Sequence, residues 1–587
     1  MTLTMKHLAK TTCCAALLLL SPAPSAQWSS DPGANQAIAA EAYAEVQPKI
    51  VPTSDGGFFV SWFANDPGGS PAGGYDVRIQ RLDATGTPGF SPSVLVADRG
   101  FSSTQDYGLA VNAADEALLI FRDDRPVGTQ ITAAKVDASG ALSWGALGVQ
   151  LTATPSFVAS PKIAATPDGG AICAWTQDAD TRVRRLDAGG SVLWASDLVL
   201  SDGTNNVGLS DLQADGAGGA LVSAVLNLTF STPRHLELRR ISPDGFELFR
   251  TAVFDGGSLQ FGNFPSFIHD GSGGAVLSWY TSSPALESRV QRIAPDGAEV
   301  FPHNGVTVST NTSLLRVSPH AVFDAATDEV AVFYTETNTG QNMDGISGQK
   351  FDAAGNRLWG STGTSIVPMG PSSRDGVRAV GTANETIVAW TDGPSFGNDT
   401  VDAAVVDGTG TATTTPFQLS SPPATKFRLN AAQGCVGYGA FVWRDERAGN
   451  ADIYAQNLGT DGTLGPIGAA GATVRNGSGV NPLVFMQTAP AIIGTPWGAS
   501  IGLGGASLSA VLIAQGGPHP GLPLAIGELL CLGPFLPANV STGTHSIGLP
   551  LNCALVGRTY CMQGAQVFLG PVQLQLTNAL DVTIGAF

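Results

Sequence analysis

A repeated unit of about 54 residues covers most of the chain, and it limits the possible folds more than any other feature. Each unit opens with a short β-type run that usually ends in an aromatic residue, often after an Asp-Gly-Gly turn, as in DGGFFVSW at residues 55–62. A second landmark has the pattern (Gln/Arg)-(Arg/Lys)-apolar-Asp-x-x-Gly, as in QRLDATG at residues 80–86. Each landmark occurs eight times, some copies in degenerate form. Two landmarks with one period indicate a structural repeat, near the roughly 40 to 50 residues of propeller blades.

Each unit divides into four short strands. In the first unit, Phe58, Val60 and Trp62 are predicted to face one side of the sheet and Phe59 the other, because side chains alternate along a strand. A four-stranded sheet that is apolar on both faces is not stable alone, and radial stacking of such sheets buries both faces. The sequence therefore predicts an all-β fold, with a β-propeller of about eight four-stranded blades in residues 27–469.

The two ends of the repeat region bear on the number of blades. The segment NQAIAAEA at residues 35–42 is similar to the last strand of a unit, such as GTSIVPMG at residues 363–370. We expect it to pair with the eighth unit and close the ring. Seven blades plus one degenerate unit is the alternative, because the unit around Ala224 lacks its aromatic residue.

The first 26 residues have the order of a secretory signal peptide. Lys6 and Lys10 precede an apolar run at residues 13–20, and small residues and prolines follow up to Ala26. This order is typical of a cleaved signal, and the run is shorter than the about 20 residues that cross a bilayer. We therefore predict a secreted protein, extracellular or associated with the cell surface, which starts near Gln27 and has no membrane span.

The chain is acidic, with a formal net charge of -18. Nucleic acids and anionic lipids are bound mainly through basic surfaces. The overall charge thus argues against both as partners.

Five cysteines follow the signal peptide: Cys173, Cys435, Cys531, Cys553 and Cys561. Outside the cell we expect one disulfide within the last three, and the spacing leaves open which two of them pair. The first of the five lies in an apolar strand, as a small buried residue would. None of the spacings is typical of a zinc site.

The eighth unit carries the sequence WRDERAGNADIYAQNLGTDGTLG at residues 443–465. It resembles a repeat of many large exported bacterial proteins, with the pattern W-x-D-x-R-x-G-x-x-D-I-Y-A-Q. A partial copy begins at Phe121. The resemblance implies a propeller in a secreted or surface-attached protein, from a family mostly without assigned activity.

Two Asp-Arg pairs belong to that motif, Asp445 with Arg447 and Asp123 with Arg125. A ligand clamp is one interpretation of them. We favour a structural role, because an Asp just after a strand can accept hydrogen bonds from loop amides and pair with a nearby Arg.

The composition changes abruptly after residue 469. Residues 470–587 contain four charged side chains, Arg475, Glu528, Arg558 and Asp581. Short apolar stretches separated by Gly and Pro predict a Gly-rich, β-sandwich-like domain. Residues 549–587 resemble a C-terminal domain of large secreted bacterial proteins, which implies a role in sorting, anchoring or assembly. A surface with so few charges is expected to pack against something.

No catalytic or cofactor-binding residue is predicted. The sequence GASIG at residues 498–502 matches the nucleophile-elbow pattern around Ser500, but no helix pattern follows, as an elbow requires. The remaining histidines are isolated, without metal-ligand spacing; they are His235, His269, His303, His320, His519 and His545. The identity of any metal is left open, and calcium is the one cofactor that an acidic exported propeller leaves open.

The preferred hypothesis is a non-enzymatic extracellular binding or scaffold protein. Its propeller would bind a glycan or a protein at the mouth where the loops gather, and its C-terminal domain would attach it to a cell-envelope component or assemble it. The alternative is a secreted hydrolase or lyase that acts on polysaccharide with acidic residues on propeller loops. Two carboxylates about 5 to 10 Å apart in the mouth would favour this alternative.

Overall fold

The structure is a computed structural model. It describes residues 27–66, 74–100, 106–227, 232–381, 385–395, 397–435 and 437–587. The predicted signal peptide, residues 1–26, lies outside the described residues. Regular structure in the described part is strand, apart from one 3-10 turn at Cys553–Leu555, which confirms the all-β prediction. No helix in those ranges is long and apolar enough to cross a bilayer.

The first four blades are four-stranded antiparallel sheets in chain order. Blade 1 consists of β2 (Glu45–Pro52), β3 (Phe58–Asp66), β4 (Gly74–Leu82) and β5 (Val94–Ala97). Blade 2 consists of β6 (Gly108–Val111), β7 (Ala117–Asp123), β8 (Gln130–Val136) and β9 (Val149–Gln150). Blade 3 consists of β10 (Val158–Ala165), β11 (Ala171–Gln177), β12 (Asp180–Leu186) and β13 (Leu198–Leu200). Blade 4 consists of β14 (Val207–Ala214), β15 (Ala220–Leu226), β16 (His235–Ile241) and β17 (Glu247–Phe254).

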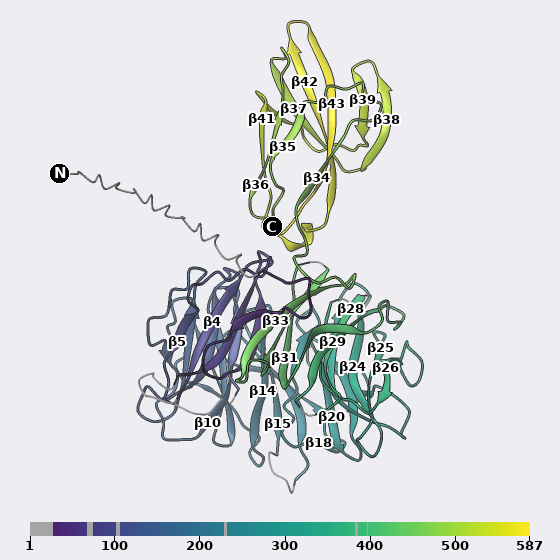
Figure 1. Ribbon diagram of the computed structural model, residues 1–587. Coiled ribbons are helices and arrows are strands. Elements are labelled where there is room, and N and C mark those ends of the chain that lie inside the picture. The colour runs from purple at the N-terminus through teal and green to yellow at the C-terminus, as the bar shows by residue number, and fades with distance from the viewer. Residues whose placement is uncertain are drawn as a thin grey trace, which may run out of the picture.

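The other four blades complete the ring (Figure 1). Blade 5 consists of β18 (Ser258–Leu259), β19 (Phe267–His269), β20 (Ala275–Ser283), β21 (Glu287–Ile293) and β22 (Val306–Thr307). Blade 6 consists of β23 (Leu315–Asp324), β24 (Glu329–Thr337), β25 (Asp344–Phe351) and β26 (Thr364–Gly370). Blade 7 consists of β27 (Ser373–Gly381), β28 (Glu385–Gly393), β29 (Asp399–Asp407) and β30 (Phe417–Ala424). Blade 8 consists of β31 (Lys426–Gln433), β32 (Tyr438–Asp445), β33 (Asp452–Gly459) and β1 (Gln36–Ala39).

The ring closes as the sequence predicts. β1, from the predicted closing segment, pairs antiparallel with β33 and is the fourth strand of blade 8. The unit around Ala224 forms the complete sheet of blade 4, although it lacks the aromatic residue. The fold is therefore a propeller of eight blades.

The cores lie between neighbouring blades. Phe58, Val60 and Trp62 pack in one buried cluster, and Phe59 packs in the next, so the predicted alternation along β3 is confirmed. The tryptophan at the same place in several other blades is likewise almost fully buried. Stacking of blades therefore buries both faces of each sheet, as the repeat requires.

The C-terminal domain is a sandwich of short strands. Its largest sheet contains β34 (Gly471–Arg475), β43 (Val572–Thr583), β42 (Thr559–Leu569), β37 (Leu508–Ala514) and β40 (Asn539–Ser541), in that order. The second sheet contains β35 (Phe485–Ala489), β36 (Pro496–Ile501) and β41 (Thr544–Gly548). A separate hairpin contains β38 (Pro518–Leu524) and β39 (Gly527–Cys531). Trp497 from the second sheet packs in one cluster with Val511 and Leu580 from the first.

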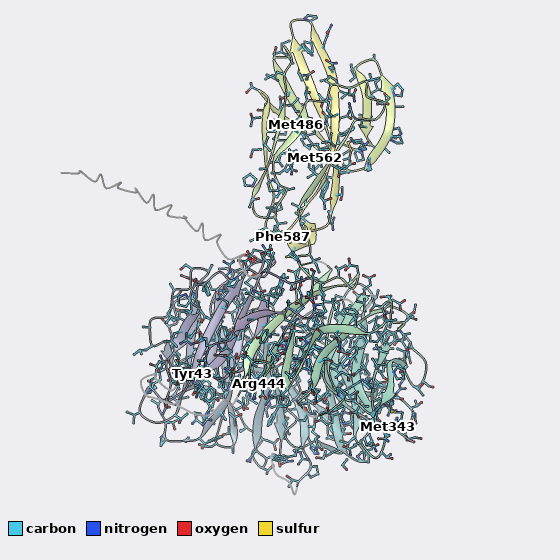
Figure 2. All side chains as sticks on the ribbon, viewed as in Figure 1. Tyr43, Met343, Arg444, Met486, Met562 and Phe587 are labelled. Carbon is cyan, nitrogen blue, oxygen red and sulfur yellow. A yellow bond between two sulfur atoms is a disulfide. The ribbon has the colours of Figure 1, made fainter. Side chains whose placement is uncertain are left out.

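The C-terminal domain stands on one face of the propeller (Figure 1). The last residue, Phe587, lies at this junction, whereas Arg444 belongs to the propeller (Figure 2). A disulfide joins Cys435, in the turn between β31 and β32, to Cys553 of the C-terminal domain. Val556 and Ala586 share a buried cluster with aromatic residues of the propeller. The two domains are therefore joined by a covalent bond and a common core.

The remaining cysteines agree with the sequence prediction. Cys531 and Cys561 form the expected disulfide within the C-terminal trio. Cys173 is free and buried among apolar residues of blade 3. The bridge between Cys435 and Cys553 was not expected, because it joins two cysteines 118 residues apart in different domains.

Candidate functional site

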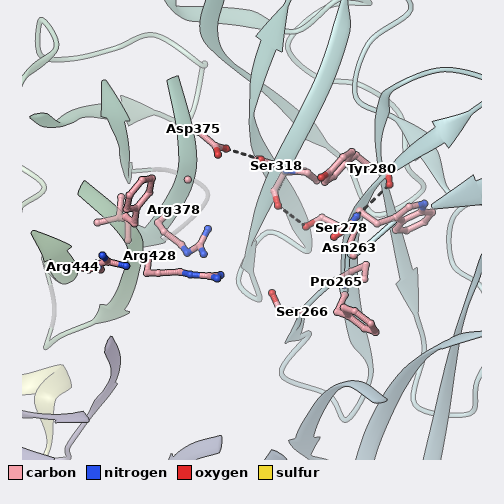
Figure 3. Close-up of a pocket in the computed structure, with 17 residues that line it drawn as sticks. Asn263, Pro265, Ser266, Ser278, Tyr280, Ser318, Asp375, Arg378, Arg428 and Arg444 are labelled. Atoms are coloured by element: carbon pink, nitrogen blue, oxygen red, sulfur yellow. Dashed lines mark hydrogen bonds between the residues drawn. The ribbon is translucent and has the colours of Figure 1, made fainter. Parts of the chain in front are cut away.

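Two adjoining cavities occupy the centre of the propeller. The first, of about 830 Å³, is lined by the innermost strands of six blades and by a loop of blade 5. The second, of about 670 Å³, lies between blades 5, 6, 7 and 8. Both are lined by Phe264, Ser266, Arg378 and Arg428, so they form one continuous space. The close-up in Figure 3 shows the second cavity.

The cavities lie toward the propeller face away from the C-terminal domain. β2 shows the direction, because Gln47 near its start lines the larger cavity. The turn beyond its other end lies at the domain junction, where Sγ of the disulfide-bonded Cys553 lies 3.5 Å from the Ser54 carbonyl oxygen. The C-terminal domain therefore packs at the end of the propeller that carries the turns between first and second strands, and the loops between second and third strands lie at the other end.

A repeated β-bulge aims side chains into the larger cavity. The pairing of β2 with β3 shifts between Val46 and Lys49, and Gln47 has a left-handed φ of 58°. Residues other than glycine rarely adopt this conformation, and bulges redirect the side chains that follow. The same device recurs in four more innermost strands. The residues that it delivers to the cavity are Lys49, Lys162, His320, Arg378 and Asn430.

One side of the cavity is electrostatically balanced. Asp106 pairs with Lys49 at 2.8 Å, from its Oδ1 to Nζ, and also pairs with Lys162. Burial alone would raise the pKa of Asp106, but the two lysines outweigh it and hold that pKa well below its usual range. Asp211 faces the same cavity from β14, and burial raises its pKa against the attraction of Lys162. Lysines and carboxylates thus neutralise each other on this side.

The opposite side carries two arginines, Arg378 and Arg428, for which the described residues supply no ion pair. Arg378 and Arg428 extend into the open space toward Ser266 (Figure 3). Among the described residues, no carboxylate lies within 4 Å of either guanidinium group, and Arg378 Nη1 donates to the Val377 carbonyl at 2.8 Å. Burial lowers the pKa of Arg378 against the attraction of the Asp375 carboxylate, and repulsion from Arg428 lowers it further. At the rim, Arg444 pairs with Glu446 and lies 5.8 Å from the ring centroid of Phe427.

Neutral donors and exposed rings complete the walls. Phe264 is 45% exposed and Phe427 is 46% exposed, although both line the cavity mouth. His320 Nδ1 accepts a hydrogen bond from the backbone N–H of Ala379 at 3.2 Å. Burial lowers the pKa of His320 to about 3, so its ring is neutral at physiological pH and carries its proton on Nε2. The space therefore combines cations, neutral donors and apolar rings.

The Asp-Arg pairs of the repeat motif lie in the framework of the blades. Asp445 accepts hydrogen bonds from Lys426 Nζ at 2.6 Å, from Trp443 Nε1 at 2.8 Å, and from the side chain and backbone N–H of Arg447. Asp123 holds the guanidinium of Arg125 through both carboxylate oxygens. These contacts support the structural interpretation.

The remaining candidates do not form a site. Ser500 lies within β36 and no helix follows it, so the nucleophile-elbow pattern is coincidental. His545 bonds to Ser509 Oγ at 2.9 Å and to Asn539 Oδ1 at 2.8 Å, a triad-like chain. Ser509 is fully buried, so a substrate has no access to it. The described ranges contain no group of three or more His, Cys, Asp or Glu side chains placed to hold a metal ion, and calcium binding stays a prediction.

The sequence reasoning did not identify the cavity residues. A local signal was present, because the tripeptide Gln-Pro-Lys at residues 47–49 has counterparts in Ser-Pro-Lys at 160–162 and Ser-Pro-His at 318–320. Each occurs where an innermost strand bulges. Arg378 and Arg428 carry no such signal, because their own bulges lack the proline.

No family model matches the sequence, and no curated protein matches it either. Solved structures are similar at low identity. The lectin BP39L from Burkholderia pseudomallei is 12% identical, with a TM-score of 0.40, over 62% of this chain and 98% of the lectin. An ulvan lyase is 10% identical, with a TM-score of 0.37, over 75% of this chain and 96% of the lyase. A protein of unknown function from Dyadobacter fermentans is 10% identical, with a TM-score of 0.33, over 72% and 97%. TM-scores this low support no inference about a ligand or a reaction.

Proposed function

We propose that this chain is an exported, non-enzymatic binding protein whose propeller holds a saccharide in the cavity on its loop face. The observation that carries the proposal is the pair of exposed rings, Phe264 and Phe427, beside arginine, amide and hydroxyl groups in one open cavity. Small-molecule sites typically combine aromatic walls with a few converging polar groups. Sugars present both apolar C–H faces and hydroxyl groups, so they match such walls.

The C-terminal domain is proposed to attach or assemble the protein. It is fixed on the face opposite the cavity by the bridge between Cys435 and Cys553 and by a shared core. Exposed apolar residues such as Leu569 and Val572 occupy its β42–β43 hairpin. Contact with a cell-envelope component through this domain would leave the cavity open to solvent.

A polysaccharide hydrolase or lyase is the second candidate. It is favoured by Asp211, whose raised pKa suits a proton donor, in the same cavity as the ionised Asp106. Against it, Asp106 is held by two lysines and is a poor nucleophile or base. Asp375 at the rim accepts a hydrogen bond from Ser318 at 2.8 Å. Binding without catalysis fits these contacts better.

The test is co-sedimentation of the chain from Gln27 to Phe587 with a panel of insoluble polysaccharides, with released sugar measured in the same tubes. A double variant, Phe264→Ala with Phe427→Ala, should bind on the order of 30-fold more weakly, since the loss of about 1 kcal/mol of stacking at each ring amounts to about 2 kcal/mol in all. Phe261→Ala is the matched control, because Phe261 is 46% exposed and does not line either cavity.

Three results would contradict the proposal. Binding to no polysaccharide, or equal binding by the double variant and the wild type, would refute saccharide binding in this cavity. Sugar release that Asp211→Asn abolishes would establish the enzymatic alternative.

A further inference from the structure

The cavity and the whole protein carry opposite charges. The chain has a formal net charge of -18. The larger cavity is lined by four basic side chains and two acidic ones, namely Lys49, Lys162, Arg378, Arg428, Asp106 and Asp211. An acidic protein therefore has a basic centre.

The excess positive charge is confined to one side of the cavity. The two lysines are near Asp106 and Asp211, on the side formed by β2, β10 and β14. Among the described residues, no carboxylate lies within 4 Å of Arg378 from β27 or Arg428 from β31, although Asp375 attracts Arg378 from a greater distance. The two arginines are close enough for Arg428 to lower the pKa of Arg378 by repulsion. The Arg378 side chain is half-buried and that of Arg428 is exposed. Two like charges side by side, one of them partly desolvated, favour the binding of an anion between them.

We infer that the ligand is an acidic polysaccharide, and that Arg378 and Arg428 together bind one of its carboxylate or sulfate groups. This inference rests on the proposed function, because it names the class of saccharide that the same cavity takes. The planar guanidinium group donates two parallel hydrogen bonds to carboxylate and sulfate oxygens, which a single ammonium group does not. The arginine side of the cavity therefore fits an acidic group of the ligand. On the lysine side, Asp106 already pairs with both lysines.

The rest of the cavity fits the neutral part of such a ligand. Asn263 and Ser266 on the facing wall and the Nε2–H of His320 are neutral groups that suit sugar hydroxyls. Phe264 and Phe427 border the mouth. Asp375, also at the mouth, disfavours a second acidic group there, so we expect the acidic group of the ligand to lie deeper, between the two arginines.

The charge on the remaining surface restricts how such a polymer binds. A polyanion lying along an acidic surface is repelled, and only the part inside the basic cavity is attracted. The affinity is therefore expected to depend on one or a few acidic sugar units. It should weaken as salt rises, because the attraction is electrostatic.

The test measures the affinity of the chain from Gln27 by calorimetry for four polymers: polygalacturonate, a sulfated galactan, the same galactan without sulfate, and polyglutamate. Arg378→Gln and Arg428→Gln should each weaken binding of the acidic polysaccharides about 10- to 100-fold, the usual effect of losing a charged hydrogen bond. Lysine at either position should recover part of the affinity, because it keeps the positive charge but cannot donate the two parallel hydrogen bonds of a guanidinium group. Arg558→Gln, on the C-terminal domain, is the matched control and should leave the affinity unchanged.

Misfolding is checked by the melting temperature. Because neither arginine forms an ion pair within 4 Å in the described part of the chain, the Gln variants should unfold close to the wild-type temperature. Comparison of the first two polymers identifies whether the bound group is a carboxylate or a sulfate.

The outcomes separate the two proposals. Equal binding of the neutral and the sulfated galactan, with no effect of either arginine variant, would overturn the acidic ligand and leave saccharide binding standing. Equally tight binding of polyglutamate would support the arginine pair and overturn the saccharide. Binding of none of the four would overturn this inference, and failure with the wider polysaccharide panel as well would overturn the proposed function.

Discussion

Removal of the buried carboxylate of Asp445 should be one of the most destabilising single changes in the propeller. The side chains of Asp445 and Lys426 are both 0% exposed, and Nζ lies 2.6 Å from the carboxylate. Asp445→Ala leaves Lys426 charged and buried without its partner. It also removes the acceptor of Trp443 Nε1 and of Arg447. Loss of one member of a buried ion pair costs about 3 to 5 kcal/mol.

The matched control is Asp123→Ala, at the same position of the motif in blade 2. There the carboxylate holds Arg125, which is 18% exposed and can reach water, so the expected cost is about 1 to 2 kcal/mol. The double variant Lys426→Met with Asp445→Asn removes both charges and should recover more than half of the loss.

The measurement is urea unfolding of each variant, followed by tryptophan fluorescence, with the slope compared to exclude a change in the denatured state. The reasoning fails if Asp445→Ala costs less than about 1 kcal/mol or no more than Asp123→Ala. It also fails if Lys426→Met does not compensate, because the loss would then have another origin.

Three further predictions concern Glu45 in blade 1, the disulfide between the two domains, and Ser500. Burial and repulsion from Asp452 raise the pKa of Glu45 to about 8, above its ordinary value of 4.5. The folded state therefore holds a proton on Glu45 more tightly than the unfolded state, so the contribution of this group to stability is complete below about pH 4.5 and is lost as pH rises through 8, on the order of 1 kcal/mol per pH unit between. Other carboxyl groups also have raised pKa values in this range, so a pH series of thermal unfolding should be less steep for Glu45→Gln than for the wild type, and equal slopes would contradict the reasoning. Replacement of Cys435 and Cys553 by serine should cost about 2 to 4 kcal/mol and speed proteolysis at the domain junction, measured by limited trypsin digestion; unchanged digestion would argue against the bridge. Ser500→Ala should leave the melting temperature and ester hydrolysis unchanged, because the residue is an ordinary strand position, and a loss of esterase activity would restore the nucleophile elbow.

The architecture was predictable because each blade repeats the same local chemistry. Asp83 accepts hydrogen bonds from the backbone N–H groups of Thr85 and Thr87, and Gly86 adopts a φ of 85° that other residues rarely take. The glycine of this turn recurs with a positive φ in all eight blades, whereas Ser242, Ala294 and Gly459 replace the Asp in three of them. Closure was predictable for the same reason, since β1 has the composition of a fourth strand.

The site was not predictable from net charge or motifs. The formal charge of -18 concealed the basic cavity, because acidic residues elsewhere outnumber the arginines that the fold gathers at one place. Arg378 and Arg428 lie 50 positions apart in chain order, and no shared motif surrounds them. Their proximity follows from the ring, which places successive innermost strands around one axis. The bridge between Cys435 and Cys553 was hidden likewise, because it depends on how two domains pack.

The two faces of the propeller differ in how strongly they constrain the sequence, which explains why the repeat pattern predicted the fold and did not identify the cavity residues. Tight turns demand particular residues, so the face that carries them has a strong sequence pattern, and this is the face on which the C-terminal domain packs through Gly56 and Cys435. The loops and bulges on the other face need only connect strands, so each blade can supply a different side chain there: lysine at position 49, histidine at 320, arginine at 378. A repeat is detected from the residues that its units share, so residues that differ between units are not identified by it. The proposed ligand specificity of this propeller depends on those differences. Arg378 in blade 7 and Arg428 in blade 8 have no arginine counterpart in the other blades, so they are the first residues to mutate.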